Sequence, residues 1–160
     1  MFRLPNATDL RLTGVVFILF AMLTSVLGLK TGLFTFHVTS ELNSILRTAL
    51  ITFAVPALIE EAVFRGPLIL LKERLNNNAF LYVCITSLLL FVAWHPLNAT
   101  FFLTAAQSTF FDWRFLMIAG LLGAGATILT IRTQTLWPAI IFHWAAVVSW
   151  KVFFGGPNFF

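Results

Sequence analysis

The stretch Ile59-Glu60-Glu61-Ala62-Val63-Phe64-Arg65 decides how this chain folds. It places three ionisable side chains inside an apolar run, residues 50–71, whose flanking charges are Arg47 and Lys72. A run of about 20 such residues is long enough to span a bilayer. A charge near the bilayer centre costs about 2.5–3.5 kcal/mol on insertion scales, and such residues usually face the interior of a helix bundle. The stretch therefore predicts a membrane helix that carries a functional site.

Helical spacing separates the two glutamates of this stretch. Glu61 and Arg65 are four residues apart, so they lie on one helix face and can pair. Glu60 points roughly 100° away and has no partner within its own helix. A second group for Glu60 must therefore come from another part of the chain.

Three histidines are the candidates for that second group. His95 and His143 lie inside apolar segments, whereas His37 lies in a loop-like stretch that predicts a surface position. A Glu-Glu-Arg helix with a histidine from each of two other helices would form a compact site within the membrane.

The composition indicates an integral membrane protein. Of the 160 residues, 59% are hydrophobic and only 10% charged, against about 25% charged in soluble domains. The net charge of +4 comes from scattered basic residues, which argues against nucleic-acid binding. Cys84 is the single cysteine, so it forms no disulfide within the chain and makes no cysteine-based metal site.

Five segments are long and apolar enough to span a membrane, which predicts an all-α, polytopic bundle of about five transmembrane helices. The first follows Arg3 and Arg11. This layout is also that of a signal peptide, but a retained membrane helix is favoured because no typical cleavage site follows.

We expect Pro96 to close the third segment, and residues 97–113 to form an interfacial or re-entrant piece. A slight excess of basic residues predicts an inside N-terminus. The segments are 12–29, 46–71, 79–96, 114–131 and 136–154.

The second segment contains two weak points. Pro56 removes a backbone donor one turn before Glu60 and predicts a bend, and Gly66-Pro67 predicts a kink or a helix end. Glu60 lies 13 residues after Arg47, or about 20 Å along a helix. Irregular backbone at that depth is tolerated where it lines a buried or wet cavity. The site is therefore expected to hold water.

Taken together, three motifs resemble the CPBP family, the type II CAAX prenyl endopeptidases and bacteriocin-processing or immunity proteins also called the Abi family. The motifs are Glu60-Glu61-x-x-x-Arg65, then Phe91-x-x-x-His95, then His143 after Thr133-x-x-Leu136-Trp137-Pro138. They occur in the family's order, and the resemblance covers roughly residues 46–150. It divides the chain into an N-terminal membrane helix with its lead-in (1–45), a protease-like core (46–154) and a short tail (155–160).

The resemblance implies a glutamic-type intramembrane protease. Glu60 and His95 would activate a water molecule, His143 would stabilise the oxyanion, and Glu61 and Arg65 would support them. The substrate would be a membrane-associated peptide or protein of CAAX or leader-peptide type, with no cofactor. We expect contact with membrane lipid, no contact with nucleic acid, and a prokaryotic-type plasma membrane location.

The third motif departs from the family pattern. The fourth residue after its histidine is normally Asn or Asp, whereas here it is Val147, which neither donates nor accepts a hydrogen bond. Loss of one oxyanion donor costs about 10²–10³ in rate. Asn98 and the indole of Trp150 are the substitutes that the sequence offers.

Three other interpretations stay open at this stage. Glu60, His95 and His143 are also a donor set that zinc accepts, which would make the protease metal-dependent. Alternatively, the chain is a non-catalytic membrane partner or immunity-type protein with the same fold, as Val147 suggests. In the third interpretation the roles are only structural: Glu61 and Arg65 form a buried ion pair, and His95 and His143 make hydrogen bonds that hold the packed helices together. A transporter is disfavoured because the chain shows no internal repeat.

Overall fold

A computed structural model gives the fold of the protein and describes residues 1–157 of its 160. The described part is mostly helical, with one isolated β-bridge between His37 and Phe154. The elements in chain order are α1 (Ala7–Lys30), α2 (Leu42–Thr52), the π-helix η1 (Phe53–Glu60), α3 (Glu61–Leu71), α4 (Asn77–Phe101), the 3₁₀ helix η2 (Thr104–Ala106), α5 (Gln107–Phe110), α6 (Trp113–Thr133) and α7 (Trp137–Phe153).

The predicted all-α membrane bundle is confirmed. Four helical stretches are long and apolar enough to cross a membrane, namely α1, the continuous path Leu42–Leu71, α4 and α6. The shorter apolar helix α7 completes the predicted five. Large apolar side chains are exposed along these helices, as is expected for surfaces that face lipid. The chain is therefore an integral membrane protein.

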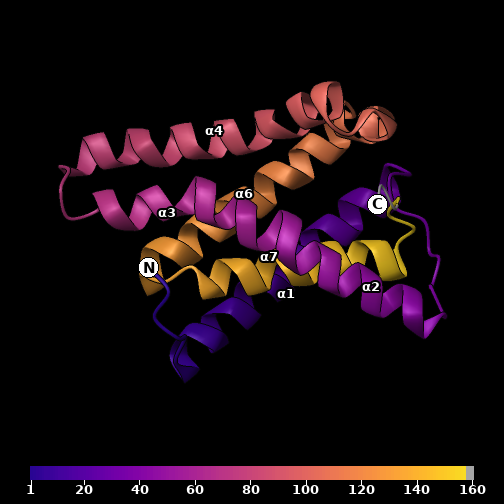
Figure 1. Ribbon diagram of the computed structural model, residues 1–160, viewed down its shortest axis with the longest axis horizontal. Helices are drawn as coiled ribbons and strands as arrows, with labels where there is room; N and C mark the ends of the chain where they lie inside the picture. Colours follow the sequence, from indigo (N-terminus) through magenta and orange to yellow (C-terminus); the bar gives the residue numbers. More distant parts are fainter. Residues whose placement is uncertain (158–160) are drawn as a thin grey trace.

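Helix α6 organises the packing. It contacts α1, α3, α4 and α7, and in Figure 1 it passes obliquely from the far end of α4 back toward the N-terminus. The same view shows α3 and α4 side by side along one edge of the molecule. A core cluster joins α4, α6 and α7 through the buried residues Phe91, Leu122, Ala126, Leu129, Ala139 and Phe142.

The path from α2 to α3 is continuous through both predicted weak points. Around Pro56 the helix widens into the eight-residue π-helix η1 rather than breaking. In a π-helix each donor bonds five residues back, and such segments are frequent at functional sites. Gly66-Pro67 was expected either to kink the helix or to end it, and the structure contradicts the second outcome, since α3 runs on to Leu71. Buried side chains on either side, Arg65 and Leu68, hold this turn in place.

The prediction that Pro96 closes the third segment is also wrong. Helix α4 continues through it to Phe101, five residues beyond the predicted end. Membrane helices tolerate proline where neighbouring structure keeps the remaining backbone groups satisfied. Residues 102–112 then form short turns, η2 and α5, which pack Ala106 and Phe110 into a second buried cluster. This piece is therefore packed against the bundle.

The first helix begins five residues earlier than its apolar run. Asn6 caps it, with Asn6 Oδ1 accepting from Asp9 N at 2.8 Å and Asp9 Oδ2 accepting from Asn6 N at 2.9 Å. This reciprocal arrangement is a capping box, which satisfies two backbone donors at a helix start. Helix α1 packs against α6 and α7. By contrast, the side chain of Glu41 at the start of α2 makes no capping hydrogen bond.

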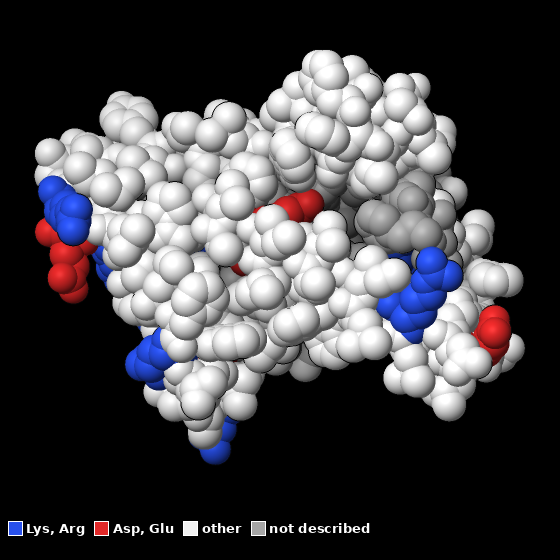
Figure 2. Space-filling view, viewed as in Figure 1, with Lys and Arg blue, Asp and Glu red and all other residues white. Residues whose placement is uncertain are grey.

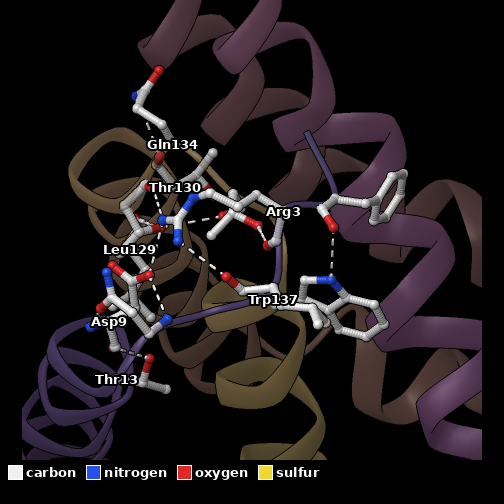
Figure 3. Close-up of polar contacts among 12 residues, drawn as sticks. Arg3, Asp9, Thr13, Leu129, Thr130, Gln134 and Trp137 are labelled. Atoms are coloured by element: carbon white, nitrogen blue, oxygen red, sulfur yellow. Dashed lines mark hydrogen bonds and ion pairs between the residues drawn. The ribbon is translucent and has the colours of Figure 1, made fainter.

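The N-terminal residues bind the turn between α6 and α7. Leu136 N donates to Met1 O at 3.0 Å, and Trp137 Nε1 donates to Phe2 O at 3.3 Å. Arg3 reaches both Asp9 Oδ2 at 2.9 Å and Thr133 O at 3.0 Å, as Figure 3 shows around the labelled Arg3. This end of the bundle therefore joins the starts of α1 and α7.

Charged residues gather at the ends of the bundle. Figure 2 shows blue and red atoms at both ends and a largely white band between them, with red acidic atoms visible in a hollow near the middle. Lys72 Nζ donates to Ile131 O at 2.9 Å, which places the α3–α4 turn at the same end as the α6–α7 turn. The side of the membrane that each end faces stays a prediction. So does the division at residues 45 and 154, and residues 158–160 of the predicted tail lie outside the described part.

Candidate active site

A cavity of about 160 Å³ lies within the bundle and is lined by residues of α1, η1, α4, α6 and α7. Most of its wall is apolar, with many phenylalanines. Glu60, His95 and His143 all line this cavity. The structure thus brings together three side chains from different helices, the first and last of which are 83 residues apart in sequence. Asn98, Val147 and Trp150 line it as well. A site with few polar groups in an apolar wall is typical of a ligand or substrate pocket.

Glu60 is the last residue of η1 and is held by one oxygen only. Its Oε1 accepts a hydrogen bond from Trp94 Nε1 of α4 at 3.2 Å. Its Oε2 is buried and has no hydrogen-bond partner among the described residues. Burying a carboxylate oxygen without a hydrogen-bond partner costs free energy, so such an atom usually bonds to a water molecule or a ligand. Glu60 is therefore positioned to bind a polar molecule in the cavity.

Glu61 occupies a different environment from its neighbour. It is fully buried, and its Oε1 accepts from His143 Nδ1 at 2.8 Å. Its Oε2 lies 3.3 Å from Arg65 Nε, so the predicted Glu61–Arg65 pair is present, although without the alignment of a hydrogen bond. Since a carboxylate oxygen only accepts hydrogen bonds, His143 Nδ1 carries the proton in this bond. This leaves His143 Nε2 for the cavity.

Arg65 is fixed from three sides. Its Nη2 donates to Gly123 O of α6 at 3.1 Å, and its guanidinium carbon lies 4.0 Å from the centre of the Phe91 ring. The side chain is fully buried. A cation over an aromatic face in a dry interior is stabilising by about 2 kcal/mol. Arg65 therefore ties α3 to α4 and α6 while it supports Glu61.

His95 is oriented by its own helix and by aromatic rings. Its Nδ1 lies 3.0 Å from Phe91 O. A carbonyl oxygen only accepts, so Nδ1 carries the proton and Nε2 keeps its lone pair. The rings of Phe91, Phe110 and Phe115 surround it, each with its centroid 5.2 Å away. The imidazole thus has one fixed orientation and one free acceptor.

Sequence reasoning missed two contacts of this site. The Trp94–Glu60 bond and the Glu61–His143 bond both join different helices, so the spacing of residues within one helix predicts neither of them. The only sequence signal was the position of Trp94 directly before His95. His37 is exposed, as predicted, and its backbone N–H donates to Phe153 O, away from the cavity.

The close approach of α6 to this site depends on Gly123. A Cβ at this position would lie 2.7 Å from Leu88 Cδ1 and 2.9 Å from Arg65 Nη2. We expect Gly123→Ala to lower thermal stability by about 1–3 kcal/mol, the usual cost of overpacking a tight core. Thermal unfolding in detergent, followed by tryptophan fluorescence, measures this.

Gly120→Ala is the matched control on the same helix. Its Cβ would meet only Val92 Cγ2 at 3.8 Å, an ordinary contact, so its unfolding temperature should stay at or above that of the wild type. Equal unfolding temperatures for the two variants would contradict the inferred tight contact at Gly123.

Within the described residues, no group of three or more His, Cys, Asp or Glu side chains has the arrangement of a preformed metal site. Glu60, His95 and His143 share the cavity wall, but their donor atoms are not clustered as a ligand shell. Closing such a shell around an ion would require these side chains to move.

The fold and the site define a polytopic membrane protein with a carboxylate and two histidines inside the bundle. A family model described as "Type II CAAX prenyl endopeptidase Rce1-like" matches residues 42–149, which covers more than half of the chain. The chain belongs to this Rce1-like family of type II CAAX prenyl endopeptidases. The comparisons with curated proteins and with solved structures gave no match.

Proposed function

We propose that the protein is an intramembrane endopeptidase that hydrolyses a peptide bond of a membrane-associated substrate of CAAX or leader-peptide type. The observation that carries the proposal is the buried, unpartnered Oε2 of Glu60 in a cavity that His95 and His143 also line. A carboxylate and an imidazole beside one water molecule are suited to general-base chemistry. Family membership supports the same reaction class.

In this proposal Glu60 and His95 position a water molecule, and Glu60 deprotonates it. The water oxygen bonds to the carbonyl carbon, Glu60 takes one water proton, and the carbonyl π pair moves to the carbonyl oxygen. Collapse of the tetrahedral intermediate re-forms the carbonyl and breaks the C–N bond. The leaving nitrogen receives the proton from Glu60, so the side chain returns to its starting form.

His143 has the role of stabilising the oxyanion. Since Nδ1 donates to Glu61, Nε2 is an acceptor in neutral imidazole and becomes a donor only in the imidazolium form. Glu61 holds the imidazole through Nδ1, and Arg65 holds the carboxylate in place. Glu61 and Arg65 therefore act as positioning residues.

The apolar wall supports a substrate with a hydrophobic segment or lipid group. Phe17, Phe20 and Phe34 line the cavity beyond the polar residues, so an apolar chain bound there would leave water. The proposal includes no cofactor, and it places the protein in a prokaryotic-type plasma membrane.

Two alternatives remain with their own observations. A metal-dependent protease is favoured by the presence of two histidines and a glutamate on one cavity wall. A non-catalytic or immunity-type protein is favoured by Val147, which lines the cavity one turn after His143 and offers no donor.

The test is cleavage by purified protein in lipid nanodiscs. The substrates are a prenylated CAAX peptide, the same peptide without the prenyl group, and a leader peptide, each with and without a strong chelator. Cleavage that persists in chelator supports the proposal, and the substrate that is cut defines its class. Loss of cleavage in chelator with recovery on zinc addition would instead establish the metal-dependent alternative. Absence of cleavage of all three by folded protein would favour the non-catalytic one.

A further inference from the structure

His143 offers the oxyanion at most one donor, because its Nδ1 is bonded to Glu61 and only Nε2 is left. A tetrahedral oxyanion accepts two or more hydrogen bonds, and preorganised donors in a dry site contribute most to its stabilisation. His95 adds no donor through Nε2, because its proton is on Nδ1 beside Phe91 O. A second hydrogen-bond donor, N–H or O–H, is therefore needed within the cavity.

Several polar groups of the cavity wall are already engaged. The hydroxyls of Thr24 and Thr52 donate to carbonyls of their own helices, Phe20 O at 2.8 Å and Thr48 O at 2.7 Å. Lys151 Nζ donates to Pro157 O. These three side chains have partners elsewhere, which makes them poor candidates for the donor.

The other candidates differ in their place along the helices. Asn98 lies three residues after His95 on α4, or about 4.5 Å along the axis. Ser149 and Trp150 lie six and seven residues after His143, or about 9–10.5 Å along α7. Ser25 belongs to α1, which packs mainly on α6 and α7. Of these candidates, Asn98 is therefore the one closest along its own helix to a histidine of the site.

Asn98 also has the chemistry and the freedom that the role needs. It lines the cavity, is half-buried, and makes no side-chain hydrogen bond within the described part of the chain. Its amide carries two N–H donors and is neutral at all relevant pH values. It lies four residues after Trp94, whose indole holds Glu60, so both side chains project from one face of α4.

We propose that Asn98 is a further catalytic residue, whose side-chain amide donates a hydrogen bond to the carbonyl oxygen of the scissile peptide. This rests on the proposed proteolytic function. The bond strengthens as negative charge develops on that oxygen, so it lowers the barrier more than it improves substrate binding. Val147 on α7 has no hydrogen-bond donor, so in this proposal the second hydrogen bond to the oxyanion comes from Asn98 on α4.

The experiment compares kcat and KM of wild type, Asn98→Leu, Asn98→Asp and Asn98→Leu/Val147→Asn on a peptide that the wild type cleaves. We expect kcat of Asn98→Leu to fall about 10²–10³-fold with KM within about threefold. Asn98→Asp keeps the shape but replaces the donor with a carboxylate, so its kcat should fall at least as far. Adding Val147→Asn, which places an amide one turn after His143, should recover tenfold or more.

Controls separate the possible failures. Asn78→Asp, an exposed change in the first turn of the same helix, should keep wild-type kcat. Activity of Asn98→Leu and Asn98→Asp within threefold of wild type would overturn the role of Asn98 while leaving the protease proposal standing. The same holds if Trp150→Phe loses the activity instead. A folded wild type as inactive as Glu60→Gln would overturn both proposals. If Asn98→Leu fails to fold by thermal unfolding, Asn98→Asp decides alone.

Discussion

Glu60→Gln is expected to reduce peptide hydrolysis by at least about 10²–10⁴-fold, the range that general-base catalysis contributes. Glutamine has the same shape, and its amide oxygen can still accept the hydrogen bond of Trp94 Nε1. The change therefore removes the base and leaves the contact between η1 and α4. Steady-state cleavage at saturating substrate, with thermal unfolding measured in parallel, tests this.

Glu73→Gln provides the matched control. Glu73 is an exposed glutamate on the α3–α4 turn, so its replacement should leave hydrolysis at the wild-type rate. A rate for Glu60→Gln within tenfold of wild type would show that another group deprotonates the water, and the role proposed for Glu60 would be withdrawn. Equal loss in both variants would point to a general effect on the protein.

Contacts within one helix were predictable because the helical period fixes them. Glu61 and Arg65 pair at i, i+4, and the same period separates Glu60 from Arg65. Apolar length likewise predicted the helices, since a bilayer demands about 20 residues per span. Local spacing and hydropathy therefore predicted the membrane helices and the Glu61–Arg65 pair.

Contacts between helices were not predictable from spacing. The resemblance implied that His143 stabilises the oxyanion with Glu61 as a support, but it did not predict the bond between Glu61 and His143 Nδ1. The spacing of residues along α4 does not predict the bond from Trp94 Nε1 to Glu60 either. Both contacts depend on how α3, α4 and α7 pack, which no single-helix pattern contains. The sequence motifs therefore indicated three residues that line one cavity, Glu60, His95 and His143, but not the contacts that hold them.

The proline positions alone do not determine the local helix geometry. Proline predicts a bend, a break or an end by removing one donor, but which of these occurs depends on the surrounding helices. At Pro56 the chain changes to a π-helix, whereas at Pro96 the α-helix continues. The first of these changes sets the rotation of Glu60 relative to the preceding α2, because the π-helix has a wider turn. Local irregularity thus determines where the predicted base points.

Arg65→Leu is expected to destabilise the protein by about 3–5 kcal/mol, the cost of leaving a buried charge without its partner. The change removes the ion pair to Glu61, the bond to Gly123 O and the contact with the Phe91 ring. Glu61 then keeps only His143 as a polar partner. Thermal unfolding in detergent should show a drop of several degrees or more.

Arg65→Leu/Glu61→Leu separates stability from activity. Replacing both members of a buried pair by apolar residues is often neutral or stabilising, so the double variant should unfold at a higher temperature than Arg65→Leu. It should nevertheless be as inactive in peptide cleavage as Glu60→Gln, because His143 Nδ1 has lost its acceptor and the imidazole is no longer held in position. If the double variant cleaved peptide at the wild-type rate, Glu61 and Arg65 would be structural only. If Arg65→Leu unfolded at the wild-type temperature, the buried pair would contribute nothing to the fold.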